Sequence, residues 1–277
     1  MLKKLYNLIN TIHLDPLTVK KAILLCFFVM GFRFAAGWLF SKFHISVGII
    51  PDLLFLAVIL LTARMMGRDE LRRILAWRDV PLAVFAGVMI MFSGLDIITS
   101  ELYNIFNILL PVPDNFFDGW FYKPRSVFLI ILTGALLPGI SEEIFFRGII
   151  ARRFFRAYSP VKSILVSAAL FGLFHLNPWQ AVNAFYFGIF LGWIYRRYKT
   201  IWLCMFTHAC HNFLVDFMPY PYIAVKNAYY LEMWRHPLWF DIMGLLLFAF
   251  GLFTLIVLGR KKQAEQTAAK INKGEIK

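Results

Sequence analysis

Long apolar segments recur along the whole sequence, and each has the length of a helix that crosses a bilayer. We recognise eight of them, covering residues 22–40, 47–66, 80–99, 126–150, 161–177, 179–197, 200–218 and 238–259. A spanning helix needs about 20 mostly apolar residues, because the helix rises about 1.5 Å per residue through a hydrocarbon core of about 30 Å. The pattern therefore predicts an all-α polytopic membrane protein with about eight transmembrane helices.

The composition agrees with a membrane protein and excludes an ordinary soluble one. Hydrophobic residues make up 60% of the chain and charged residues only 16%, against about 45–50% and about 25% in soluble domains. No internal repeat or low-complexity stretch divides the apolar region. Residues 1–259 are predicted to form a single helical membrane domain with a motif-bearing core at 126–218, and residues 260–277 a polar cytoplasmic tail.

The net charge of +13 is explained by membrane orientation, so we expect no nucleic-acid partner. Lys and Arg concentrate in cytoplasmic loops, where anionic lipid headgroups attract them. Both ends of the chain and every second connection between the apolar segments are basic, which predicts that both termini are cytoplasmic. The basic residues concerned are Lys3, Lys4, Lys20, Lys21, Arg64, Arg68, Arg72, Arg73, Arg78, Arg152, Arg153, Arg156, Lys162, Arg196, Arg197, Lys199, Arg260, Lys261 and Lys262.

Charged and polar side chains inside apolar segments are the candidates for function. A charge near the bilayer centre costs about 2.5–3.5 kcal/mol on insertion scales. Two isolated charged residues can be explained without a functional role. Arg33 in the first segment can snorkel, and Asp96 near the end of the third segment can lie at the membrane interface. A denser group lies on the fourth, fifth and seventh segments, and comprises Glu142, Glu143, Arg147, His175, His208, His211 and Asn212.

Helical spacing assigns partners within this group. Glu143 and Arg147 are four residues apart and can form a salt bridge that lowers the cost of burial. Glu142 lies about 100° around the helix from Glu143, so Arg147 does not easily pair with both carboxylates, and Glu142 remains available for another role. Glu142 and His175 lie at similar distances either side of the turn near Ser159-Pro160, so an antiparallel hairpin brings them nearly level.

A carboxylate facing a histidine is a plausible general-base unit. His208 and Asn212 share a face of the seventh segment, where they can supply hydrogen-bond donors to an oxyanion.

Three motifs in order resemble those of the CPBP family, which comprises the type II CAAX prenyl endopeptidases and their prokaryotic relatives. They are EExxxR (Glu142, Glu143, Arg147), FxxxH (Phe171, His175) and HxxxN (His208, Asn212), and they cover residues 141–213. The resemblance implies a glutamic-type intramembrane endopeptidase. Water would be activated by Glu142 and His175, and the oxyanion stabilised by His208 and Asn212. Glu143, Arg147 and Phe171 would support the site.

The same resemblance implies the rest of the functional assignment. No cofactor is expected, and the substrate would be a membrane-anchored or lipidated peptide or protein within the lipid bilayer. We expect an integral multi-pass protein of the prokaryotic cytoplasmic membrane.

Three other interpretations remain open. Glu142, His175 and His208 are also legitimate ligands for zinc, which would make the chain a zinc-dependent membrane protease. Buried Glu and His residues also occur in ion or proton transporters, although the chain has one polar cluster and no evident inverted repeat. The third is a non-catalytic membrane scaffold or immunity protein of the same fold.

Overall fold

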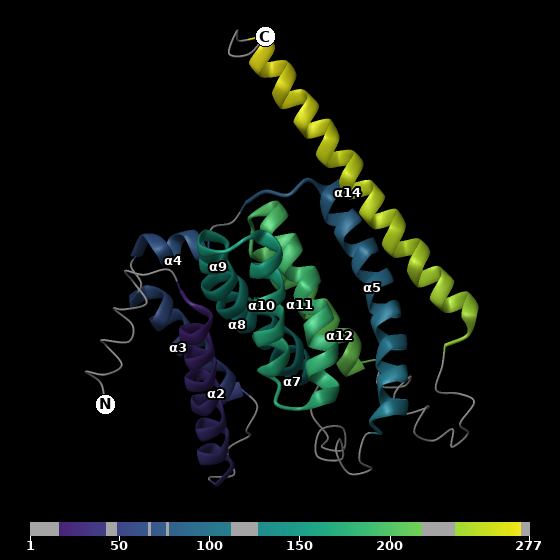
Figure 1. Ribbon diagram of the computed structural model, residues 1–277. Helices are drawn as coiled ribbons and strands as arrows, with labels where there is room; N and C mark the ends of the chain where they lie inside the picture. The colour runs from purple at the N-terminus through teal and green to yellow at the C-terminus, as the bar shows by residue number, and fades with distance from the viewer. Residues whose placement is uncertain are drawn as a thin grey trace. The chain divides into compact units, whose positions relative to one another are not determined.

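The computed structural model describes residues 17–42, 49–65, 68–75, 78–111, 127–217 and 236–272. Within those ranges every regular element is a helix and there is no strand, which confirms the all-α prediction (Figure 1). The elements are α2 (Val19–Lys42), α3 (Ile49–Met65), α4 (Arg68–Ile74), α5 (Leu82–Leu109), α7 (Val127–Ile130), η1 (Ile131–Leu136), α8 (Leu137–Glu143), η2 (Ile144–Ala151), α9 (Arg152–Ala157), α10 (Pro160–Leu173), α11 (Pro178–Tyr198), α12 (Trp202–Phe217) and α14 (Leu238–Asn272).

Each predicted apolar segment overlaps a helix, but only three described helices are both long and apolar enough to cross a membrane. These are Leu82–Leu109, Val127–Ala157 and Leu238–Thr267. The chain is thus an integral membrane protein. The total of eight spans and the cytoplasmic position of both termini stay predictions; Lys3 and Lys4, on which the orientation partly rests, lie outside the described residues.

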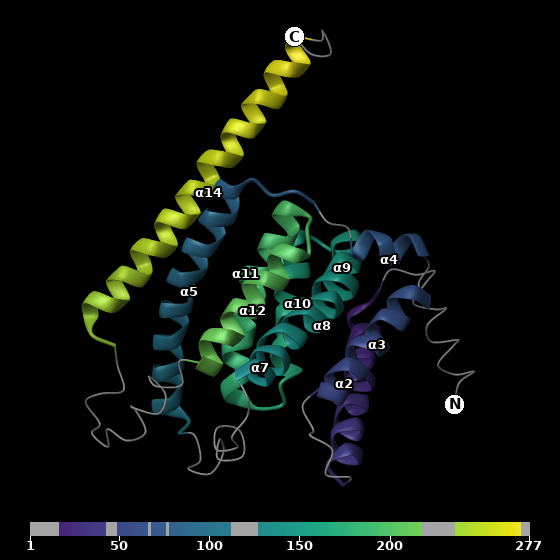
Figure 2. The ribbon, with the colours of Figure 1, turned by 180° about the vertical axis from the view of Figure 1, so that it is seen from behind.

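The helices form two compact units. The first comprises Met1–Arg78 with Leu110–Tyr229, and the second Asp79–Leu109 with Tyr230–Lys277. One membrane domain over residues 1–259 stays a prediction. All the motif residues belong to the first unit, in which α2 and α3 lie side by side (Figures 1 and 2).

The helix that carries the EExxxR motif runs from Val127 to Ala157 and contains two π-helical stretches. The first, η1, ends just before Pro138, which has no N–H to donate and whose ring crowds the preceding turn. The second, η2, starts directly after Glu143 and includes Arg147. Wider π turns are rare and often lie at functional sites. Here they flank the two glutamates on either side.

The predicted turn at Ser159-Pro160 is confirmed, while the helix after it is shorter than expected. Ser159 caps α10 by accepting a hydrogen bond from the Lys162 backbone N–H, and proline occupies the first turn. The fifth segment was predicted to be helical to residue 177, but α10 ends at Leu173. Asn177 then caps α11, because Asn and the following Pro favour a helix start over a continuation. His175 therefore lies in the turn between α10 and α11.

The second unit consists of α5 and α14, which pack closely along each other (Figure 1). A Cβ on Gly94 would come within 2.3 Å of the Phe248 backbone, and one on Gly251 within 2.5 Å of the Met91 backbone. Small residues permit this close approach of helices in membranes. The polar tail from residue 260 continues α14 as helix to Asn272, and residues 273–277 lie outside the described part.

Candidate active site

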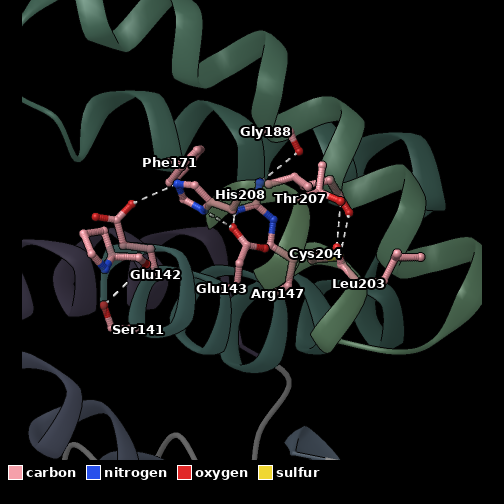
Figure 3. Close-up of polar contacts among 12 residues, drawn as sticks. Ser141, Glu142, Glu143, Arg147, Phe171, Gly188, Leu203, Cys204, Thr207 and His208 are labelled. Atoms are coloured by element: carbon pink, nitrogen blue, oxygen red, sulfur yellow. Dashed lines mark hydrogen bonds and ion pairs between the residues drawn. The ribbon is translucent and has the colours of Figure 1, made fainter. Parts of the chain in front are cut away.

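Glu143 and Arg147 form the buried salt bridge that their spacing predicted (Figure 3). Arg147 Nη1 lies 2.7 Å from Glu143 Oε1, and the two side chains are 2% and 0% exposed. The guanidinium also donates through Nη2 to the carbonyl of Gly188 at 3.3 Å and lies 4.6 Å from the ring centroid of Phe171. These contacts tie the EExxxR helix to α10 and α11.

His208 reaches from α12 to a position between the two glutamates (Figure 3). Its Nδ1 lies 2.8 Å from Glu143 Oε1. Because a carboxylate paired with arginine accepts hydrogen bonds, Nδ1 is the donor. The other nitrogen, Nε2, lies 4.0 Å from Glu142 Oε2. Glu143 therefore orients the imidazole so that Nε2 faces Glu142.

The close approach of α8 and α12 brings His208 to the glutamates. A Cβ on Gly139 would lie 3.0 Å from the backbone nitrogen of Ala209 and 3.2 Å from its Cα. Glycine at position 139 allows the helices to pack at this distance, three residues before Glu142 and beside His208. The Pro138-Gly139 pair thus contributes through helix packing as well as through the π turn before it.

Glu142 has a charged partner that sequence reasoning missed. Its Oε1 accepts from Arg33 Nη1 at 3.2 Å, and Arg33 Nη2 donates to Asp52 Oδ1 at 3.3 Å. Arg33 comes from α2 and Asp52 from α3. Their presence in apolar segments was the only sequence signal. From the sequence, Arg33 was explained by snorkelling and Glu142 had no partner, whereas helix packing places α2 and α3 against this site and pairs the two residues.

His175 lies beside the site from the turn after α10. Its Nδ1 donates to the Phe171 carbonyl at 3.0 Å, and its ring meets the Phe171 ring edge to face, with centroids 5.2 Å apart. The charges of His175, Glu142 and His208 act on one another. The hairpin argument thus placed His175 near Glu142 correctly, although the residue is held by a turn and not by a helix.

Phe171 forms one wall of the site. It is buried, and its ring contacts Arg147, His175 and His208. Asn212 lies one turn beyond His208 on α12 and is half-buried; among the described residues no hydrogen bond reaches its side chain. His211 stacks on Phe187 with centroids 4.4 Å apart and so lies beside the cluster.

The three proposed zinc ligands were Glu142, His175 and His208. Both histidines direct Nδ1 to an oxygen, a carboxylate for His208 and a backbone carbonyl for His175, and metal-binding histidines are commonly oriented in this way. In the part of the chain that the structure describes, the group whose potential ligand atoms all lie within 4.8 Å of one another is a different one, Glu101, His236 and Asp241 in the second unit. Hydrogen bonds within that group already satisfy His236 and Glu101.

These features define a helical membrane protein with a buried site of carboxylates, arginines and histidines. Residues 124–214 match the family model described as type II CAAX prenyl endopeptidase Rce1-like. A similar curated protein is the putative membrane peptidase YdiL of Bacillus subtilis (strain 168), 29% identical over 123 residues, which cover 44% of this chain and 49% of that protein. The chain thus matches about half the length of this relative. No solved structure matches.

The matched segment contains all three motifs, and this match agrees with the resemblance to the CPBP family that the motifs indicated.

Proposed function

We propose that the chain is an intramembrane endopeptidase that hydrolyses a peptide bond in a membrane-associated substrate with water activated at Glu142. The observation that carries this proposal is the 4.0 Å separation between Glu142 Oε2 and His208 Nε2. This distance is too long for a direct hydrogen bond, and it suits one water molecule within reach of both atoms. The family match and the relative's name support peptide hydrolysis as the reaction.

The chemistry follows from the charges around that water. Glu142 takes a proton from the water as the water oxygen attacks the peptide carbonyl, and His175, whose charge acts on Glu142, assists. Glu142 then gives the proton to the leaving nitrogen as the C–N bond breaks. His208 is oriented by the hydrogen bond from its Nδ1 to Glu143, and its Nε2 faces the reaction centre, where it donates to the developing oxyanion when that nitrogen carries a proton. Asn212, whose side chain has no hydrogen-bond partner among the described residues, supplies a second donor.

Glu143 and Arg147 keep this arrangement in place. Both hydrogen bonds to Glu143 fall on Oε1, while its Oε2 is buried with no hydrogen-bond partner among the described residues. A buried carboxylate oxygen is expected to be satisfied, and a water or a substrate N–H group is the natural donor here. The supporting role proposed for Glu143 therefore includes orientation of the water or of the substrate.

The substrate class follows from where the site lies. Glu142 and Glu143 sit within the span Val127–Ala157, so a scissile bond must be presented close to the lipid phase. We propose a membrane-anchored or lipidated peptide as substrate, of the CAAX type or the C-terminal part of a secreted precursor. The bacterial relative supports placement in a prokaryotic cytoplasmic membrane.

Mass spectrometry of membrane-tethered peptide libraries tests the proposal. The native protein should release products, whereas Glu142→Gln, which keeps the shape of the side chain and loses the base, should release none. Glu265→Gln changes the same residue type on the exposed tail of α14 and should cleave like the native protein. Products that are identical for the native protein, Glu142→Gln and empty membranes would refute the proposal.

The second candidate is a zinc protease that uses the same residues, favoured by the orientation of the two histidine Nδ1 atoms. Glu142, His175 and His208 would hold the zinc ion, which would polarise the carbonyl and activate the water. A zinc chelator added to the native protein separates the two mechanisms. Cleavage that survives the chelator supports the glutamic mechanism, and cleavage that is lost and returns with added zinc supports the metal.

A further inference from the structure

The two adjacent glutamates are each paired with an arginine of their own. Glu143 pairs with Arg147, and both side chains are almost completely buried. Glu142 pairs with Arg33, whose side chain is 35% exposed while that of Glu142 is 6% exposed. The motif accounts for the first pair only. The second joins the proposed base to a residue more than a hundred positions earlier in the chain.

Arg33 is held by three contacts from two other helices. Its guanidinium donates to Asp52 of α3 and to Glu142 of α8, and lies 5.2 Å from the centroid of the Phe55 ring. Phe55 is fully buried and packs on Phe174, the neighbour of His175. A planar guanidinium that donates to two carboxylates and rests on a ring has little freedom to turn.

Asp52 is well placed to anchor the arginine. It lies in the first turn of α3, where the helix dipole favours a negative charge, and its side chain is only 12% exposed. The charges of Asp52 and Glu142 also act on each other, so Arg33 separates two carboxylates that would otherwise repel. Removing Arg33 therefore leaves Glu142 with a repelling neighbour and without its partner.

The two oxygens of the Glu142 carboxylate have different neighbours, and this determines which oxygen faces the substrate. Oε1 is held by Arg33 and Oε2 faces His208. We infer that Arg33, anchored by Asp52, is a positioning residue that fixes the Glu142 carboxylate and directs Oε2 toward the reacting water. This inference rests on the proposed function and adds to it a pair of residues from α2 and α3 that lies outside the three motifs.

Steady-state kinetics with a cleaved peptide tests the inference. Arg33→Gln should lower kcat by about 100-fold, as expected when a catalytic group is slightly misplaced, with KM changed by less than about twofold because substrate binding is untouched. Arg33→Lys keeps the charge but cannot donate to both carboxylates in fixed geometry, so its kcat should be intermediate. Added guanidinium should restore part of the activity of Arg33→Ala, because the side chain it replaces is partly exposed.

Arg64→Gln is the matched control, because Arg64 is an exposed arginine at the end of α3. It should keep native kinetics. Asp52→Asn should also lower kcat. The losses caused by Asp52→Asn and Arg33→Gln should not add in the double variant, because both changes free the Glu142 carboxylate from its fixed position.

Three results would overturn the inference: an unchanged kcat in Arg33→Gln, a rise in KM alone, or a loss matched by a lower melting temperature that neither Lys nor guanidinium restores. Infrared spectroscopy of glutamate labelled with carbon-13 gives a readout that needs no cleavage. The carboxylate band that Glu142→Gln removes should shift in Arg33→Gln and should not shift in Arg64→Gln. A shifted band together with no cleavage by the native protein would refute the proposed function while leaving the Arg33–Glu142 contact intact.

Discussion

The two adjacent glutamates should differ in how much an isosteric change to glutamine destabilises the protein. Glu143→Gln removes the countercharge of Arg147, whose side chain is 2% exposed and cannot turn to water. Breaking one side of a buried ion pair costs about 3–5 kcal/mol. Glu142→Gln removes one of two carboxylates around Arg33, which is 35% exposed and keeps Asp52. Because Arg33 is partly exposed and keeps a second carboxylate, the loss should lie near the value for exposed pairs, about 0–1 kcal/mol.

These free energies translate into a measurable difference in melting temperature. For a chain of this size each kcal/mol shifts Tm by about 2–4 °C, so Glu143→Gln should lower Tm by about 6–20 °C. Glu142→Gln should lower it by no more than about 4 °C. Intrinsic tryptophan fluorescence of the purified protein in one detergent, heated at one rate, is a suitable assay. Both variants should lose cleavage, so the difference in Tm, and not the loss of activity, distinguishes the two glutamates.

A double variant provides the control. Glu143→Gln combined with Arg147→Met removes both buried charges, and it should melt closer to the native protein than Glu143→Gln alone, because an apolar replacement leaves no charge unpaired. Equal destabilisation by Glu142→Gln and Glu143→Gln, or an unchanged Tm in Glu143→Gln, would refute the assignment of Arg147 to Glu143 and of Arg33 to Glu142.

Three further changes test the packing and the site. Gly139→Ala should lower both kcat and Tm, because its Cβ would meet the Ala209 backbone, whereas Gly31→Ala, with nothing within 4 Å of the added carbon, should leave kcat unchanged. His208→Ala should abolish cleavage of a tethered peptide, and residual cleavage above about one hundredth of the native kcat would contradict its role at the oxyanion. Lys199→Gly should raise Tm, because residue 199 has a φ of 56° and glycine tolerates that conformation. Burial and two nearby arginines lower the pKa of Lys199 in the folded protein, so native stability should rise with pH as the lysine loses its proton, and the advantage of Lys199→Gly should shrink above neutral pH.

Local spacing was sufficient for the part of the site that lies on one helix. Glu143 and Arg147 are four residues apart on a helix, so their salt bridge could be predicted without knowledge of the fold. The same holds for the capped turn at Ser159-Pro160, since Ser and Pro favour a helix start. The end of α10 was not predicted, because apolar residues continue past Leu173 and hydropathy does not register the turn that Asn177 imposes.

Contacts between segments that are distant in the sequence could not be predicted from residue spacing. The pairing of Arg33 with Glu142 joins residues 109 positions apart, and nothing in the α2 sequence indicates which face of that helix meets α8. His208 was assigned to the oxyanion by its motif, while its bond to Glu143 depends on the close approach of α8 and α12 at Gly139.

The sequence by itself determined that this chain is a helical membrane protein and singled out the motif residues of its polar cluster, because the cost of burying charge in lipid makes such residues rare in apolar segments. Only the tertiary structure decided how those residues pair. The energy of an ion pair depends on atomic distance and burial, and these are set by the packing of helices that the sequence places far apart.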